Sequence, residues 1–284
     1  MTRIAYVNGQ YVPQSAATVH IEDRGYQFAD GVYEVCIVVN GRYWDMEGHL
    51  ARLQRSLNEL QMAAPMDIEA LKVVMGEVVR RNRLKNALVY MQVTRGVAPR
   101  NHPFPPEGTR PSLVITARRF DLDQSDAKAK TGVSVISQPD IRWGRVDIKT
   151  VGLLPNALAK QAAAEAGAAE ALLVRDGVVT ECSSSNAWIV DETGAIVTHP
   201  KTNRILGGIT RQTAIACAEE LQIKVIERPF TLEEAKAAPE VFITSATSFV
   251  MPVISVDGVR IGSGKPGPVA MRLREAYKAR AARG

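Results

Sequence analysis

The sequence predicts a mixed protein with α+β and α/β segments that folds as two domains. Short β-branched runs that flank Asn-Gly or Asp-Gly pairs predict antiparallel hairpins, and longer runs with leucines at helical spacing predict helices. A polar stretch at 119–128 has almost no β-branched residues and predicts a linker. We therefore expect an N-terminal α/β domain at 1–118 and a larger C-terminal domain at 129–284, and 284 residues suffice for both.

The N-terminal part combines hairpins with two amphipathic helices. Asn8-Gly9 and Asn40-Gly41 are tight-turn pairs, because both turn positions require positive φ. Leucines at 50, 53, 57 and 60 recur at helical spacing. The expected strands are 4–7, 10–12, 31–39, 42–45, 88–94 and 112–116, and the expected helices are 46–60 and 68–82.

The C-terminal part alternates hairpins with helices that have clear ends. Gly167 is a C-cap signal, Asp176-Gly177 is a turn pair, and Thr231 with Glu234 forms a capping-box pattern. The expected strands are 133–136, 171–174, 178–181, 187–190, 195–198, 241–244, 253–256 and 259–261. The expected helices are 156–166, 209–221, a short one from 231, and 266–282.

Composition excludes several classes of protein. The chain is 46% hydrophobic and 23% charged, and its net charge of +5 is scattered without a basic, aromatic-interleaved face for nucleic acid. The three cysteines are widely separated and lack metal-ligand spacing, which suits a reducing compartment. The sequence shows no signal peptide and no apolar run of membrane-spanning length, so a cytoplasmic protein is expected.

Lys149 stands in an apolar run with Ile148, Val151 and Leu153. Such a lysine is unusual, because a buried ammonium must be paired or lose its proton. An uncharged lysine amine is a nucleophile that forms Schiff bases with carbonyl groups. The alternative is a lysine at a strand end whose ammonium reaches solvent, and this segment alone does not decide between them.

Other polar residues have both structural and functional interpretations. Tyr33 and Glu34 point to opposite faces of a strand, which predicts one core aromatic and one solvated acid. Arg52 lies beside the apolar stripe of its helix. Its side chain either extends along this stripe to place its charge in solvent, or binds an anion. Arg100 and His102 are two residues apart in a Pro- and Gly-rich loop, where they form either a carboxylate-binding pair or an ordinary polar surface.

Three further segments carry polar groups in the C-terminal part. Glu181 ends an expected strand beside the residues Cys182 to Asn186, either in a hydrogen-bonded pocket or in a solvated turn. The sequence Gly207-Gly208-Ile209-Thr210 begins a helix and offers backbone amides and a hydroxyl to a phosphate, or is a plain helix cap. A second cluster of small hydroxyl residues follows the strand at 241–244.

One chemistry uses an amine nucleophile, a separate acid, a helix-start phosphate site and an arginine together. It is pyridoxal phosphate bound to a lysine as a Schiff base. The lysine forms the imine and moves a proton, the acid pairs with the pyridine nitrogen, and amides with an arginine hold the phosphate. A separate cation binds the substrate carboxylate.

The chain closely resembles fold-type IV pyridoxal-phosphate aminotransferases, and among them the D-amino acid (D-alanine) aminotransferases. The resemblance spans nearly the whole chain and consists of many ordered motifs. The matching segments are 22–28, 30–35, 49–53, 92–96, 99–102, 140–143, 147–149, 180–186 and 208–211. The resemblance implies two domains with the cofactor in the cleft between them.

The resemblance also implies a role for each matching residue. Lys149 resembles the Schiff-base lysine and proton carrier, and Glu181 resembles the partner of the pyridine nitrogen. Arg52 with Ile209 and Thr210 resembles the phosphate site. The implied cofactor-binding positions also include Ser183, Ser245 and Ala246. The implied substrate-carboxylate site is built from Tyr33, Arg100 and His102.

Two further implications concern reaction and assembly. The implied reaction is a ping-pong transamination of a D-amino acid, with 2-oxoglutarate or pyruvate as the 2-oxo acid. In the family, the Arg-x-His loop comes from the neighbouring subunit, which implies a homodimer. The sequence departs from the family at Ala246, often a threonine, and at Phe249, commonly a glutamate. One phosphate hydroxyl is then missing or supplied by Ser245 or Thr247.

Several rival functions share some of these features. A branched-chain L-amino acid aminotransferase would share the lysine, the glutamate and the phosphate residues, but not a carboxylate site built on Arg100 and His102. Aminodeoxychorismate lyase has the same fold and eliminates pyruvate. An R-selective amine transaminase would accept amines without a carboxylate, which the Arg100 loop disfavours. A basic binding module or scaffold would not need Lys149 and Glu181.

Overall fold

The computed structural model describes residues 3–282, and its contacts divide the chain into two compact units. Unit 1 comprises residues 1–120 and 148–152, and unit 2 comprises residues 121–147 and 153–284. Lys149 falls within the predicted C-terminal domain, but its contacts place it in unit 1.

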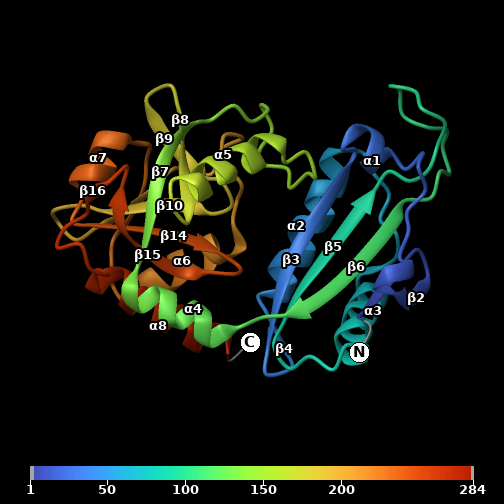
Figure 1. Cartoon of the computed structure of the whole chain (residues 1–284), viewed down its shortest axis with the longest axis horizontal. Coiled ribbons are helices and arrows are strands. Elements are labelled where there is room, and N and C mark those ends of the chain that lie inside the picture. Colours follow the sequence, from blue (N-terminus) through green and yellow to red (C-terminus); the bar gives the residue numbers. More distant parts are fainter. Residues whose placement is uncertain (1–2, 283–284) are drawn as a thin grey trace. The chain divides into compact units, whose positions relative to one another are not determined.

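Unit 1 is built on a six-stranded antiparallel sheet with the order β2-β1-β6-β5-β3-β4. Figure 1 shows β3, β5 and β6 side by side. Asn8 and Gly9, and likewise Asn40 and Gly41, take positive φ in the two expected turns. The strands are β1 (Ile4–Val7), β2 (Gln10–Pro13), β3 (Gly31–Val39), β4 (Arg42–Trp44), β5 (Ala87–Thr94) and β6 (Ser112–Arg119).

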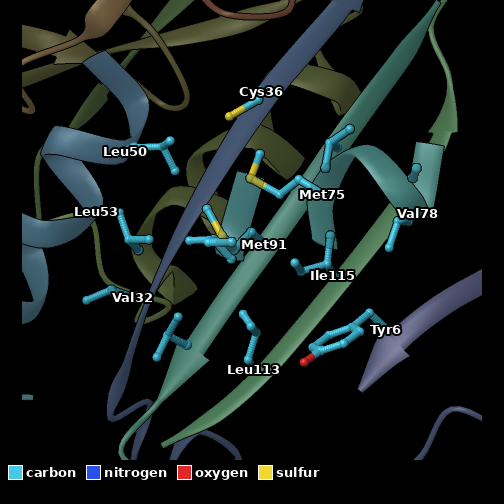
Figure 2. Packing of buried hydrophobic residues seen from close by; sticks show 14 of the residues in the cluster. Tyr6, Val32, Cys36, Leu50, Leu53, Met75, Val78, Met91, Leu113 and Ile115 are labelled. Carbon is cyan, nitrogen blue, oxygen red and sulfur yellow. The ribbon is translucent and has the colours of Figure 1, made fainter. Parts of the chain in front are cut away.

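Helices α2 (Met46–Glu59) and α3 (Ile68–Arg81) bury their apolar faces in a single cluster with the sheet of unit 1. Leu50 and Leu53 of α2 meet strand residues such as Cys36 in this core (Figure 2). A 3-10 turn at Gln14–Ala16 and the short helix α1 (Arg24–Phe28) complete the unit. Asp23 caps α1, because its side chain accepts a hydrogen bond from the Gly25 amide.

Unit 2 contains a ten-stranded sheet with the order β12-β11-β10-β14-β15-β7-β8-β9-β13, and β16 pairs with β15. Most pairs are antiparallel, while β7 is parallel to β15 and β8, and β11 is parallel to β12. The strands are β7 (Val133–Pro139), β8 (Glu170–Arg175), β9 (Val178–Cys182), β10 (Asn186–Val190), β11 (Ile196–Thr198), β12 (Val225–Glu227), β13 (Phe230–Thr231), β14 (Glu240–Ser245), β15 (Phe249–Val256) and β16 (Val259–Arg260).

Five helices pack against this sheet. They are α4 (Leu122–Thr131), α5 (Leu154–Glu165), α6 (Ile209–Glu220), α7 (Leu232–Ala237) and α8 (Pro268–Ala281). Helix α5 lies on β8, and α4 and α8 contact β15. The capping box predicted for Thr231 and Glu234 is present at the start of α7. Within residues 3–282, no helix combines the length and hydrophobicity needed to cross a membrane.

The structure differs from the sequence-based expectation mainly in short elements. The segment 119–128, predicted to be a linker, largely belongs to helix α4, because Asp121 caps this helix and Ala129 is buried in the core of unit 2. Helix α1, which was not among the expected helices, begins at Arg24 in a polar stretch and is capped by Asp23. Strands β12 and β13 were not expected, because two or three residues carry no periodic signal.

Candidate active site

The backbone of Lys149 is fixed against the first half of β3. The carbonyl of Lys149 accepts a hydrogen bond from the Tyr33 amide at 3.0 Å, and the Val151 amide donates to the Gly31 carbonyl at 3.0 Å. An isolated antiparallel bridge joins Val32 to Thr150. The segment of Lys149 is therefore an extra strand-like piece of unit 1, which fixes where the lysine side chain starts.

The Lys149 side chain is half-buried and lies over an aromatic ring. Its Nζ is 4.1 Å from the centroid of the Tyr33 ring, a cation-π distance. Within residues 3–282, no carboxylate lies within ion-pair distance of this nitrogen. The structure thus brings two of the predicted site residues together.

The burial of Tyr33 and Glu34 on β3 is the reverse of the expected core aromatic and solvated acid. Glu34 is 0% exposed, whereas Tyr33 is half-buried and lies near Tyr90, with ring centroids 5.7 Å apart. The prediction of a solvated acid at 34 was wrong. The physical reason is the period of two along β3, because Glu34 shares the core face with Val32 and Cys36 and meets α2 there.

Glu34 is held by two residues of α2. Nε and Nη2 of Arg52 donate to its two carboxylate oxygens at 2.7 and 2.8 Å, and Nδ1 of His49 lies 2.7 Å from Oε2. Burial by itself raises the pKa of Glu34, but Arg52 and His49 outweigh burial and lower this pKa to about 2. Arg52, which is predicted to bind phosphate, is therefore a cation held in one orientation, because its Nε and Nη2 atoms pair with Glu34.

Arg100 and His102 lie in the exposed loop between β5 and β6 and share one aromatic contact. The guanidinium of Arg100 is 5.0 Å from the ring centroid of Phe28, and the His102 ring is 5.5 Å from it, centroid to centroid. Both side chains are exposed. The structure therefore brings these two predicted carboxylate-binding residues to the same ring at the end of α1.

In unit 2, Glu181 is a buried carboxylate at the end of β9. The Nδ2 atom of Asn186 donates to its Oε2 at 2.9 Å, the Leu206 amide donates to the same oxygen at 3.1 Å, and Arg142 binds Oε1. Burial raises the pKa of Glu181 above its ordinary value, and Arg142 opposes this rise. Of the two sequence interpretations, the hydrogen-bonded pocket is the one observed.

Arg142 connects Glu181 to a second buried acid. It forms a two-pronged ion pair with Asp140 at 2.8 Å on both prongs, and Thr180 donates to Asp140 at 2.8 Å. Burial alone would raise the pKa of Asp140, but Arg142 outweighs burial and lowers this pKa to about 2. Arg142 thus contacts two carboxylates, of which Asp140 also pairs with Arg175 at 3.0 Å, and Glu181 has a fixed orientation beside a shared cation.

Ser183 is buried, and its hydroxyl is engaged inside unit 2. It donates to Glu170 Oε2 at 2.6 Å, and both the amide and the hydroxyl of Ser184 also bind Glu170. Lys160 balances this carboxylate from 2.9 Å. The cofactor-binding role predicted for Ser183 stays a prediction, and the observed bonds show how the segment after Glu181 is anchored.

The start of α6 offers donors that an anion can use. Gly208 is its N-cap, and among the described residues no side chain caps this helix. Ile209 and Thr210 are the first two helical residues, and both are buried. First-turn amides and the positive end of the helix dipole bind phosphate groups readily. A Cβ at Gly208 would lie 2.1 Å from Asn186 Oδ1, so this glycine permits close contact with the residue that holds Glu181.

Ser245 and Ala246 lie in the tight turn between β14 and β15. The Ser245 hydroxyl is 2.6 Å from the Ser248 hydroxyl, and the Ser248 amide donates to Ser245 at 3.2 Å. Phe249 closes the turn with a left-handed φ of 58°, and Arg274 of α8 donates to the Ser248 carbonyl at 2.7 Å. Ala246 adds no hydroxyl, so Ser245, Thr247 and Ser248 supply the hydroxyl groups here.

The donor set of the chain fits pyridoxal phosphate. Unit 1 contributes a lysine amine without a carboxylate partner among residues 3–282, and Arg52 as a fixed cation. Unit 2 contributes an oriented, buried carboxylate at Glu181 and the start of α6. These are the groups that an aldehyde carbon, a pyridine nitrogen and a phosphate require. Within residues 3–282, no cluster of side chains suited to a metal ion was found.

Comparison with known proteins defines the family. The family model of the class IV aminotransferases matches residues 31–256. The chain therefore belongs to the class IV aminotransferases, which use pyridoxal phosphate.

The relatives found by sequence include D-alanine aminotransferases. The chain is 43% identical over 271 residues to that of Bacillus licheniformis, covering 95% of this chain and 94% of the relative. It is 40% identical over 277 residues to that of Staphylococcus haemolyticus, covering 98% and 97%.

Similar solved structures include branched-chain amino acid aminotransferases. The T.th. enzyme, complexed with N-(5'-phosphopyridoxyl)-L-glutamate, matches with a TM-score of 0.89 and 28% identity, covering 100% of this chain and 96% of the other. The Escherichia coli enzyme matches with a TM-score of 0.90, 24% identity and coverage of 99% and 95%. The fold-type IV fold expected from the resemblance is confirmed.

Sequence reasoning passed over two residues that organise the site. Glu34 was taken as solvated, although its alternation with Val32 and Cys36 was a readable signal for the buried face. Arg142 lies in the matching segment 140–143, for which no residue role was predicted. An Asp-x-Arg spacing is common in loops, so nothing in the sequence alone indicated that Arg142 reaches Glu181 across 39 positions.

Proposed function

We propose that this protein is a D-amino acid aminotransferase that exchanges the amino group of D-alanine with a 2-oxo acid, 2-oxoglutarate or pyruvate. The identity of 40–43% to D-alanine aminotransferases, over at least 95% of the chain, is the observation that carries the proposal. The presence of the Arg100 and His102 pair supports it independently, because a substrate carboxylate needs such donors.

Each residue then has a defined task toward the cofactor. Bound pyridoxal phosphate supplies an electron sink that acidifies the α-hydrogen of the substrate and carries its amino group. Lys149 binds the cofactor and moves a proton between the substrate α-carbon and the cofactor C4′ atom. Glu181 holds a proton on the pyridine nitrogen. Arg52 and the first amides of α6, at Ile209 and Thr210, bind the phosphate.

The geometry at Lys149 and Glu181 supports these tasks. The amine of Lys149 lies over the Tyr33 ring, 4.1 Å from its centroid, and its backbone is fixed against β3. An acid that pairs with a pyridinium must be oriented and sheltered from water. Glu181 meets this need through Asn186, Leu206 and Arg142.

The branched-chain L-amino acid aminotransferase is the rival with a specific observation in its favour, because similar solved structures carry that name. Their identity of 24–28% is well below that of the D-alanine aminotransferases. Arg100 and His102 also favour the D-specific reaction, because the Arg-x-His loop belongs to the resemblance to the D-amino acid aminotransferases. We therefore assign the D-specific activity.

We further infer that two copies of the chain form the working enzyme, and that Arg100 and His102 serve the substrate bound to the neighbouring copy. Exposed apolar side chains surround this loop in unit 1, namely those of Ile21, Tyr26, Val97 and Phe104. Such a patch beside a polar loop is typical of a surface that another protein covers. The proposed partner is a second copy of the same chain.

The test uses two variants that are each impaired in a different part of the proposed site and are assayed at a D-alanine concentration well below the raised KM. Lys149→Ala should lose nearly all formation of pyruvate from D-alanine and 2-oxoglutarate, because it lacks the amine that binds the cofactor and moves the proton. The double variant Arg100→Ala/His102→Ala should have intact Lys149 but a strongly raised KM for D-alanine.

Mixing these two variants under conditions that exchange subunits distinguishes the arrangements. If the loop serves the neighbouring copy, each mixed dimer contains one complete site, and a statistical mixture should regain about a quarter of the wild-type activity. If the loop serves its own copy, no mixed dimer has a complete site and activity stays absent. Wild-type turnover by Lys149→Ala alone would refute the proposed function.

A further inference from the structure

Arg24 lies beneath the Arg100 loop and binds its backbone. It is the first residue of α1 and is 4% exposed. Its Nη1 donates to the Asn101 carbonyl at 2.6 Å, and its Nη2 reaches the His102 carbonyl at 3.4 Å. Within the described part of the chain, these are the only hydrogen bonds found for residues 99–104. The backbone of the loop therefore depends on this one guanidinium.

Arg24 is itself fixed by Asp30. The Nε atom of Arg24 donates to Asp30 Oδ2 at 2.8 Å, and Arg95 binds both oxygens of the same carboxylate at 2.8 and 3.0 Å. Arg95 also donates to two carbonyls at the end of α2, so Asp30 is tied to the helical layer of unit 1. The position of Arg24 is thus set by the body of the unit and not by the loop.

The ring of Phe28 links the same arginine to the functional side chains. The guanidinium carbon of Arg24 is 4.7 Å from the ring centroid, and that of Arg100 is 5.0 Å from it. The His102 ring packs on Phe28 as well, at 5.5 Å. Arg24 therefore acts on the loop twice, through the carbonyls of its peptide bonds and through the ring that Arg100 and His102 share.

We propose that Arg24 is a positioning residue for substrate binding, which holds Arg100 and His102 in the arrangement that receives the substrate carboxylate. This inference rests on the proposed function, in which these two residues bind that carboxylate. An exposed loop without such bonds would have to be ordered each time substrate binds, and this ordering cost would weaken binding. Arg24 and Asp30 supply the order in advance.

The test replaces the planar guanidinium of Arg24 by a lysine ammonium, which keeps the positive charge. In Arg24→Lys, a single nitrogen cannot bind Asp30 and both loop carbonyls together. We expect the KM for D-alanine to rise about tenfold, as for the loss of one charge-assisted hydrogen bond, while kcat changes much less. The reaction of the loaded enzyme with isopropylamine, which has no carboxylate, should keep its rate, and the cofactor affinity should stay the same.

Arg80→Lys is the matched control, because it also loses a two-pronged pair with a carboxylate, that of Glu77 on α3, but makes no bond to Asp30 or to the Asn101 or His102 carbonyls. It should keep the KM of the wild type. If Arg24→Lys does not fold, Phe28→Leu removes the shared ring and should raise the KM for D-alanine in the same way. An unchanged KM in Arg24→Lys, or an equal loss with isopropylamine, would overturn the inference.

Combination with the loop variant separates this inference from the proposed function. If Arg24 acts through Arg100 and His102, Arg24→Lys should add almost nothing in the Arg100→Ala/His102→Ala background, since the two effects are not independent. A full additional loss in that background would refute the positioning role alone. If the loop variant itself leaves the KM for D-alanine unchanged, the proposed carboxylate site is wrong and the role of Arg24 falls with it.

Discussion

The carboxylate of Glu34 shows how one buried charge prepares a residue for another task. A cation such as Arg52 is costly to hold away from water unless it is paired. Glu34 provides that pairing from the core face of β3, and His49 adds a second contact to its Oε2 atom. Arg52 is then held in one orientation before any phosphate arrives, which is the condition for strong anion binding.

This pairing predicts a pH dependence of stability. The folded-state pKa of Glu34, about 2, lies below its ordinary value of 4.5. The ionised form therefore stabilises the fold at pH values above 4.5, and this contribution disappears as the pH falls from 4.5 through about 2. Glu34→Gln should lose roughly 3 kcal/mol of unfolding free energy at neutral pH and show a flatter acid limb.

Urea denaturation of both proteins across the acid range measures this effect. Glu77→Gln is the control, because Glu77 also has a pKa lowered to about 2 but pairs with Arg80 and Arg81 on the surface of α3. Exposed pairs of this kind contribute little. Equal losses of stability in the two variants would contradict the role given to burial at Glu34.

At the residue scale, sequence reasoning identified candidates better than it identified their surroundings. Lys149 and Glu181 were singled out by their unusual neighbours, and each is held in a distinctive setting. The role of Arg142 as a partner of Glu181 was not predicted, because the two residues are 39 positions apart, and neither was the bond from Arg24 to Asn101, 77 positions away. A spacing pattern carries no information on such contacts.

At the scale of elements, the beginning of α6 connects two parts of the proposed site. Asn186 of β10 donates to Glu181 and also to the Leu206 carbonyl, which precedes the helix. Gly208 packs directly on Asn186, and its φ of −60° would suit any residue. The requirement for glycine at this position is therefore a matter of space and not of backbone conformation.

Two neighbouring glycines allow a matched test. A Cβ at position 208 would collide with Asn186 Oδ1 at 2.1 Å, whereas a Cβ at position 207 would meet only the flexible end of Lys201, at 2.9 Å. Gly208→Ala should weaken cofactor binding about tenfold or more, since it displaces a donor to Glu181. Gly207→Ala should bind nearly as the wild type does. Titration of each protein with pyridoxal phosphate, followed by absorbance, measures both, and equal affinities would count against this coupling.

Elements with strong local signals were predicted well, and elements held by tertiary contacts were not. The hairpins at Asn8-Gly9 and Asp176-Gly177 and the helices α2, α3 and α8 lie close to their predicted positions. Helices α1 and α4 were missed because their sequences are polar, and their stability comes from caps at Asp23 and Asp121 and from packing. Propensity alone does not reveal such helices.

At the scale of the whole molecule, the sequence resemblance and the fold agree on a class IV aminotransferase. The boundaries predicted at 118 and 129 stay a prediction. Contacts assign residues 148–152 to unit 1, although the chain on both sides of them belongs to unit 2. Local sequence patterns do not predict that residues 148–152 join unit 1, because their pairing with β3 connects positions more than a hundred residues apart.

The most direct test of the account follows the visible absorption of the purified protein loaded with pyridoxal phosphate, with D-alanine in one cuvette and L-leucine in another. We predict that the absorption band of the bound cofactor bleaches with D-alanine and persists with L-leucine, and that added 2-oxoglutarate restores it. Bleaching by L-leucine alone would contradict the D-specific assignment and the use made of Arg100 and His102.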